Sequence, residues 1–182
     1  MLFRSDLRHD SQGLSDQEVL RLIGAAEAQA EGLFFPDTYL FAKASSDLDV
    51  LRRAYHAMQR RLSDEWAARA PNLPYRTPYQ ALILASIVEK ESGRGSDRPE
   101  VAAVFVNRLR RGMLLQTDPT VIYGLGDRFD GNLRKKDLLA DTPYNTYTRA
   151  GLPPTPIAMP GQASLRRSEE RRVGKECRSR WS

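Results

Sequence analysis

The spacing of apolar positions predicts four long helices and one short helix, most of them opened by a recognisable start signal. A Ser or Thr with Glu, Asp or Gln three residues later, the capping-box spacing, occurs at Ser15, Ser46 and Thr77. The predicted helices run from Ser15 to about Gly32, from Ser46 to Trp66, from Thr77 to Gly93, from Pro99 to Gly112, and from Asp118 as N-cap to Gly124.

The third of these helices is expected to lie at the centre of the fold. Residues 81–88 are apolar nearly all round the helix, which is typical of a buried helix. Residues 33–40 form an aromatic stretch broken by proline, which favours extended or turning backbone packed on a core. Residues 130–161 are rich in Gly, Pro, Asn and Thr, and we expect a structured loop region in which a functional site can lie.

Composition fits one globular domain of ordinary size. The 182 residues are 41% hydrophobic and 28% charged, without an apolar run of about 18 residues and without a secretory signal in the first residues. Of the net charge of +5, residues 166–182 carry seven basic and three acidic groups. Because the basic excess is confined to this terminal segment rather than spread over a folded face, we do not expect nucleic-acid binding.

Elimination leaves carboxylate chemistry as the kind of catalysis that the chain can support. The two histidines, His9 and His56, lie outside the Gly- and Pro-rich half, and Cys177 is the single cysteine. The chain therefore offers neither a Ser-His-Asp arrangement nor a cluster of zinc ligands, and its glycines match no phosphate loop. We expect no cofactor and no metal.

Glu91 is the strongest candidate for such chemistry. Leu84, Ile87, Val88 and Glu91 occupy positions i, i+3, i+4 and i+7, so Glu91 continues an apolar face at the end of the buried helix. Partial desolvation and the negative end of the helix dipole would both disfavour an ionised carboxyl and so raise its pKa. A carboxyl that stays protonated near neutral pH can act as a general acid. Periodicity alone leaves open that Glu91 is an ordinary helix-terminal residue facing solvent.

The two residues before Glu91 receive a simpler interpretation. Glu89 lies about 200° from Glu91 around the helix. We interpret Glu89 and Lys90 as solvated charges, and expect Glu89→Gln to matter little.

Six sequence blocks carry a resemblance to a known family. They are, in order, residues 31–39, 84–92, 104–109, 115–124, 144–147 and 151–154. Together they resemble the MltG/YceG-like family of endolytic murein transglycosylases, from about Glu31 to Leu165, and Glu91-Ser92 is similar to the catalytic Glu-Ser pair of lytic transglycosylases. Thr155 and Met159 depart from the residues expected in that proline loop.

The resemblance implies a fold class and a division of the chain. The class is α+β, mainly helical, with a lysozyme-like catalytic domain truncated at both ends. Residues 1–44 would be a remnant of the LysM-like and linker region, residues 45–165 the catalytic domain, and residues 166–182 an atypical basic tail, disordered and foreign to the family.

The resemblance also implies a reaction on peptidoglycan glycan strands. Glu91 would protonate the oxygen leaving MurNAc and then act as base on the C6 hydroxyl of that sugar, giving 1,6-anhydro-MurNAc ends without water. This lyase activity would serve cell wall biogenesis and glycan chain termination, with peptidoglycan synthases as candidate partners. The location would be the periplasmic face of the inner membrane, through an N-terminal anchor that this chain does not carry.

By the same resemblance, five residues are candidates for lining the glycan groove: Gln116, Asp118, Tyr123, Tyr144 and Asn145. Tyrosine rings stack on sugars, and amides bond N-acetyl groups. Each residue also has a structural interpretation; Asp118 can be an N-cap only, and Tyr123 a core aromatic only.

Two other functions stay open. A lysozyme-like hydrolase would need a second carboxylate opposite Glu91, for which Asp118 and Asp97 are the nearest candidates in the sequence. A non-catalytic fragment that only binds peptidoglycan would be expected if the groove is incomplete.

Overall fold

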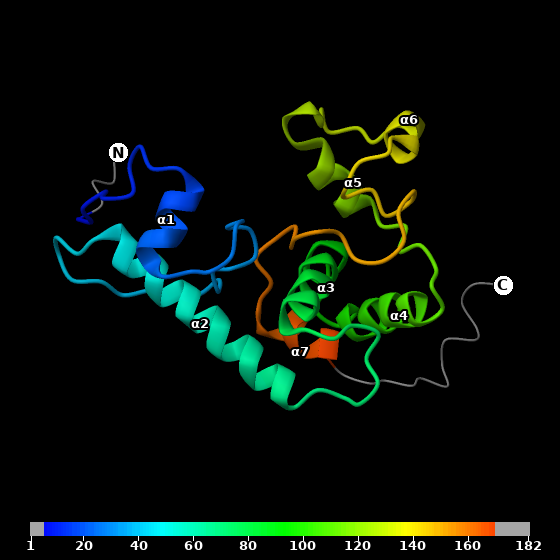
Figure 1. The fold of residues 1–182 in the computed structure, drawn as a ribbon, viewed down its shortest axis with the longest axis horizontal. Helices are drawn as coiled ribbons and strands as arrows, with labels where there is room; N and C mark the ends of the chain where they lie inside the picture. Colours follow the sequence, from blue (N-terminus) through cyan, green and yellow to red (C-terminus); the bar gives the residue numbers. More distant parts are fainter. Residues whose placement is uncertain (1–5, 170–182) are drawn as a thin grey trace.

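The computed structural model describes residues 6–169, which form helices and loops (Figure 1). The elements are α1 (Asp16–Ile23), α2 (Asp47–Ala67), α3 (Pro78–Glu91), α4 (Arg98–Arg110), α5 (Asp118–Leu125), the 3-10 helix η1 (Gly126–Arg128), α6 (Lys135–Leu139) and α7 (Gln162–Glu169). Within this range the β structure is limited to an isolated parallel bridge between Arg8 and Ser46. The prediction of a mainly helical fold is confirmed, and the strands expected of an α+β class are not found among these residues.

Helix α3 lies at the centre of the fold, as predicted. The Thr77 side chain accepts a hydrogen bond from the Gln80 N–H, the Gln80 side chain accepts from the Thr77 N–H, and Pro78 occupies the first turn. All eight residues from 81 to 88 are buried, and α2, α4, α5 and α7 pack around them. The helix ends at Glu91, two residues before the predicted stop, because Ser92 is extended with φ −93° and ψ 100°.

Helices α1 and α2 form the N-terminal part of the packing. The predicted capping box at Ser15 is present, but α1 ends at Ile23 because Gly24 adopts the left-handed conformation with φ 82°. Ser46 caps α2 as expected through a bond from the Leu48 N–H, whereas Asp49 pairs with a neighbouring arginine on its own helix instead of completing a box.

Residues 33–35 join this N-terminal part to the rest of the fold, and their side chains are buried as the sequence predicts. Gly32, directly before them, has φ +81°, and a Cβ built there would lie 2.4 Å from the Pro156 Cβ. Only glycine therefore allows this close approach of the 30s segment to residues 156–158.

Helix α7 crosses the expected boundary between residues 165 and 166. Leu165 and Ser168 are fully buried, and the Tyr75 hydroxyl donates to the Ser168 carbonyl. The four residues 166–169, which were expected to belong to a disordered tail, are helical as part of α7, and Ser168 among them is buried. The remainder of that tail, residues 170–182, lies outside the described residues.

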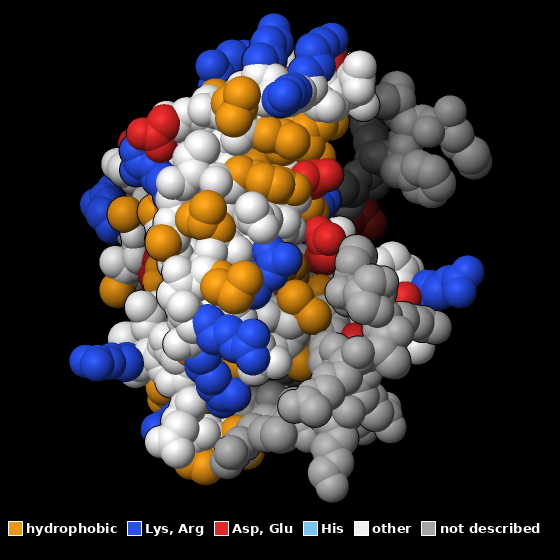
Figure 2. Space-filling model, turned by 90° about the vertical axis from the view of Figure 1, so that its right-hand side faces the viewer, with side chains coloured by type: hydrophobic (Ala, Val, Ile, Leu, Met, Phe, Trp, Pro, Cys, Tyr) orange, Lys and Arg blue, Asp and Glu red, His pale blue; other side chains and the backbone are white. Residues whose placement is uncertain are grey.

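No helix between residues 6 and 169 is both long and apolar enough to cross a bilayer. On the face drawn in Figure 2, hydrophobic side chains gather in a band between two groups of Lys and Arg, and acidic side chains lie on both sides of the band. The basic groups on this face thus form no continuous stripe.

Candidate active site

Glu91 lies at the last position of α3, and its side chain is exposed. Its Oε2 accepts a hydrogen bond from the Thr117 hydroxyl at 2.9 Å. The helix-terminal position agrees with the sequence. Among residues 6–169, the Thr117 hydroxyl is the one hydrogen-bond donor to Glu91, so the rest of the carboxylate is open to a ligand.

Thr117 belongs to a buried network of three threonines at the start of α5. The Thr117 N–H donates to Thr146 Oγ1 at 3.1 Å, and Thr120 Oγ1 donates to the Thr117 carbonyl at 2.8 Å. The hydroxyls of Thr120 and Thr146 lie 2.8 Å apart. Each of the three residues is at most 2% exposed, so the network fixes the segment that faces Glu91.

Asp118 is exposed at the first position of α5, and the N-cap is Thr117 rather than the predicted Asp118. The Tyr147 hydroxyl donates to Asp118 Oδ1 at 2.6 Å. Burial, the hydrogen bond to Asp118 and the negative charges of Asp118 and Glu91 raise the pKa of Tyr147 to about 12. Tyr147 therefore stays a hydrogen-bond donor at neutral pH, and it ties Asp118 to the same corner of the molecule as Glu91.

Gln116 is exposed directly before this network and has φ +52°, a left-handed backbone conformation uncommon for a residue other than glycine. Its N–H donates to the Thr146 carbonyl at 3.1 Å, and its side-chain Oε1 accepts from Arg108 at 3.2 Å. Among residues 6–169 its Nε2 donates to no protein acceptor, so this amide can bind a ligand. Backbone strain at such a position is common in functional sites.

Tyr123 and Tyr144 form a separate aromatic pair. Their ring centroids lie 4.8 Å apart with the planes inclined at 59°, and both side chains are half-buried. The Tyr144 hydroxyl lies 2.7 Å from Thr155 Oγ1, so the threonine that departs from the family pattern is part of the packing here. No described contact joins either ring to Glu91.

Asn145 is fully buried, and both ends of its amide are used within the protein. Its Nδ2 donates to the carbonyls of Asp137, Leu138 and Ala140, at 3.3, 3.1 and 2.6 Å. Its Oδ1 accepts from the Tyr147 N–H at 2.9 Å. Asn145 therefore caps the end of α6 and holds Tyr147, and its amide does not reach the exposed surface.

The interpretation of Glu89 as a solvated charge is wrong. Its carboxylate accepts from Arg98 Nη2 at 2.9 Å, from the Gly161 N–H at 3.0 Å and from Ser164 Oγ at 2.7 Å. Burial alone would raise the pKa of Glu89, but the hydrogen bonds from Ser164 and Gly161 and the charge of Arg98 outweigh it and lower the pKa. An ionised Glu89 thus joins α3, α4 and the start of α7, whereas Lys90 is exposed as expected.

Ser92 and Asp97 lie on the connection from α3 to α4. Ser92 is 7% exposed, and its hydroxyl has no hydrogen-bond partner among the described residues. Asp97, a candidate second carboxylate, is exposed at the N-cap of α4 and accepts from the Ser96 hydroxyl. No described contact links Asp97 to Glu91, which leaves Asp118 as the better placed of the two.

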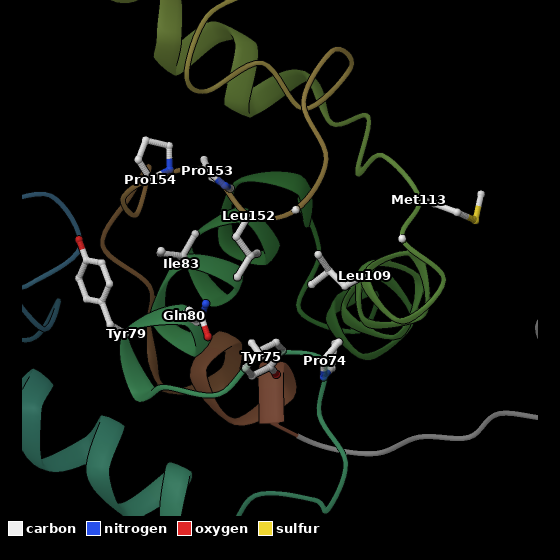
Figure 3. Close-up of a pocket in the computed structure, with 12 residues that line it drawn as sticks. Pro74, Tyr75, Tyr79, Gln80, Ile83, Leu109, Met113, Leu152, Pro153 and Pro154 are labelled. Atoms are coloured by element: carbon white, nitrogen blue, oxygen red, sulfur yellow. The ribbon is translucent and has the colours of Figure 1, made fainter.

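A cavity of about 490 Å³ lies apart from this corner, beside the N-terminal half of α3 (Figure 3). Ile83 and Leu152 approach one another across it, and Met113 points outward. Glu91, at the opposite end of α3, does not line this cavity. Glu91 and Asp118 lie instead in the exposed corner formed by the end of α3 and the start of α5.

Comparison with known proteins identifies the family of this chain. The family model described as the YceG-like family matches residues 4–170. The chain belongs to the YceG-like family. An endolytic murein transglycosylase of Bacillus subtilis (strain 168) is 38% identical over 134 residues, and one of Streptococcus pneumoniae serotype 2 is 32% identical over 148 residues. A crystal structure of a yceG-like protein of Listeria monocytogenes superposes with a TM-score of 0.66 at 32% identity, covering 83% of this chain.

This YceG-like chain spans only part of each of these relatives. The alignments cover 74% and 79% of this chain but 37% of the Bacillus protein and 26% of the Streptococcus protein. The superposition covers 52% of the Listeria chain.

Proposed function

We propose that this YceG-like chain carries the catalytic site of an endolytic peptidoglycan transglycosylase, a lyase, in a lysozyme-like catalytic domain. The observation that carries the proposal is the contrast between Glu91 and its neighbours. Glu91 is exposed with one oxygen held by Thr117, whereas Glu89 is committed to three structural hydrogen bonds. The names of the Bacillus and Streptococcus relatives support the same reaction.

Glu91 would act in two proton transfers. Protonated Glu91 donates to the oxygen between MurNAc and GlcNAc while the bond from that oxygen to C1 of MurNAc breaks. The resulting carboxylate then accepts the proton of the C6 hydroxyl of MurNAc as O6 bonds to C1. The 1,6-anhydro ring closes, Glu91 regains its proton, and no water is consumed.

Asp118 would assist through its charge. The transition state at C1 has oxocarbenium character, and a fixed carboxylate near it is favourable. Tyr147 holds Asp118 Oδ1, whereas Asp118 Oδ2 has no hydrogen-bond partner among the described residues and is available to a substrate. The same placement supports the second candidate, a hydrolase in which Asp118 assists an attacking water.

Binding of the glycan would use the exposed groups around this corner. Gln116 offers an amide nitrogen whose oxygen is already held by Arg108, and Tyr123 and Tyr144 offer aromatic surface farther along. Asn145 would support the groove from below rather than line it. We propose peptidoglycan synthases as partners and the periplasmic face of the inner membrane as the place of action, in wall biogenesis and chain termination.

Mass measurement of the products tests this proposal. Purified glycan strands are digested in water enriched in oxygen-18, and the new chain ends are weighed. Transglycosylation predicts MurNAc ends that are lighter by one water and carry no oxygen-18. Reducing ends that carry the heavy oxygen would support the hydrolase, and intact strands that remain bound would support a non-catalytic fragment.

A further inference from the structure

Thr117 occupies a position at which its hydroxyl is expected to cap the following helix. It is the N-cap of α5, and a threonine there ordinarily accepts a hydrogen bond from an N–H of the first helical turn. In this chain the Thr117 side chain makes no such bond. Its hydroxyl instead reaches across to Glu91 Oε2. A local preference given up in this way is typical of a functional site.

The hydroxyl protons of the threonine network fix the direction of that bond. Thr120 uses its proton toward the Thr117 carbonyl, so the proton shared by Thr120 and Thr146 comes from Thr146. Thr146 Oγ1 also accepts from the Thr117 N–H. Neither neighbouring hydroxyl thus competes for the Thr117 proton, which is donated to Glu91.

Because Thr117 is buried, water cannot easily replace its hydroxyl as the hydrogen-bond donor to Glu91. Thr117 is 2% exposed, whereas Glu91 is exposed at a helix end, where its side chain would otherwise sample several rotamers. The Thr117 bond selects one of them. It also makes the two carboxyl oxygens unequal, because Oε2 accepts from Thr117 and Oε1 is left for substrate.

We propose that Thr117 is the positioning residue of Glu91, an inference that rests on the proposed function. The hydrogen bond from the Thr117 hydroxyl to Oε2 is compatible with both protonation states of Glu91, provided that Oε1 carries the proton that is transferred to and from the substrate. Thr117 therefore keeps the same oxygen facing the glycosidic bond in the first transfer and the C6 hydroxyl in the second. Thr117 touches neither substrate nor reacting atoms.

The test compares Thr117→Val, which keeps the shape and removes the donor, with Thr117→Ser, which keeps the donor. We expect Thr117→Val to lower kcat roughly ten-fold, as for loss of a hydrogen bond to a charged group. KM should change less than about two-fold, since ground-state binding is left in place. Thr117→Ser should recover most of the lost turnover. Thr38→Val, the same change at an exposed threonine, is the matched control.

The outcomes separate this inference from the proposed function. If the unaltered chain forms no anhydro ends, the proposed function fails. If it forms them, Glu91→Gln does not, and Thr117→Val turns over normally, only the role of Thr117 is overturned. Equal losses in the Val and Ser variants would also overturn it, because turnover would then not be preserved by the hydroxyl that Thr117→Ser retains. Thr117→Ala replaces Thr117→Val if the latter does not fold, as judged by circular dichroism.

Discussion

Replacing Glu89 by Gln should destabilise the fold substantially, although the change is a single atom. The carboxylate accepts three hydrogen bonds, from Arg98, Gly161 and Ser164. The amide of Gln presents one acceptor and one donor. Whichever way it turns, an N–H of the amide faces Arg98 or faces the two donors at the start of α7.

The magnitude follows from the bonds that are lost. A hydrogen bond to a charged group contributes about 1.5–3 kcal/mol, and a donor left without an acceptor costs roughly 1 kcal/mol or more. Glu89 is partly exposed, with a side-chain exposure of 26%, so hydrogen bonds to water offset part of the lost free energy. We expect a loss of about 2–4 kcal/mol in the free energy of unfolding, and a fall in Tm of about 5–12 °C for a chain of this size.

Urea unfolding and thermal melting, followed by circular dichroism, measure the effect. The matched control is Glu100→Gln, the same change at an exposed carboxylate in the first turn of α4, which should cost less than about 1 kcal/mol. If Glu89→Gln unfolds within error of Glu100→Gln, the three contacts do not stabilise the fold and the reasoning is refuted.

Three further predictions concern the stability of the fold. Because the pKa of Glu89 is lowered in the fold, its contribution to stability is fully present above the unfolded pKa of about 4.5 and is lost as pH falls through the lowered value. Melts between pH 7 and 3 should therefore show a weaker acid dependence in Glu89→Gln than in the unaltered chain. Gly32→Ala should cost about 2–4 kcal/mol in urea unfolding, from left-handed strain plus the clash with Pro156, whereas Gly13→Ala, with φ +82° and open space, should show the strain alone. Asn145→Ala should lower stability by about 1–3 kcal/mol and speed amide exchange in residues 135–140, and unchanged exchange there would contradict its capping role.

The sequence predicts those features that are decided within one or two helical turns. The capping boxes at Ser15 and Thr77 involve residues three apart, and the structure confirms both. The apolar run 81–88 likewise predicts its own burial. The position of Glu91 at the end of that helix follows from the same local pattern.

The remaining features depend on contacts between distant parts of the chain. Glu89 is directed away from Glu91 as helix geometry requires, but the sequence does not show that α7, more than 70 residues later, begins beside it. The bond from Thr117 to Glu91 spans 26 residues. Asn145 is of a residue type common in exposed loops, and its burial follows from the carbonyls at the end of α6. The one local signal for Thr117, a threonine directly before Asp118-Pro119, predicts a cap and not a catalytic contact.

The turnover of Glu91→Gln on purified glycan strands tests the central claim most directly. The amide keeps the shape of the side chain but can neither donate nor accept the transferred proton, so we predict a loss of about a hundred-fold or more in the rate of new chain ends. Its melting temperature should stay near that of the unaltered chain, because Glu91 is exposed. Glu89→Gln, assayed below its own melting temperature, should retain turnover per folded molecule. Near-normal turnover in Glu91→Gln, together with loss of turnover in folded Glu89→Gln, would contradict the assignment of Glu91.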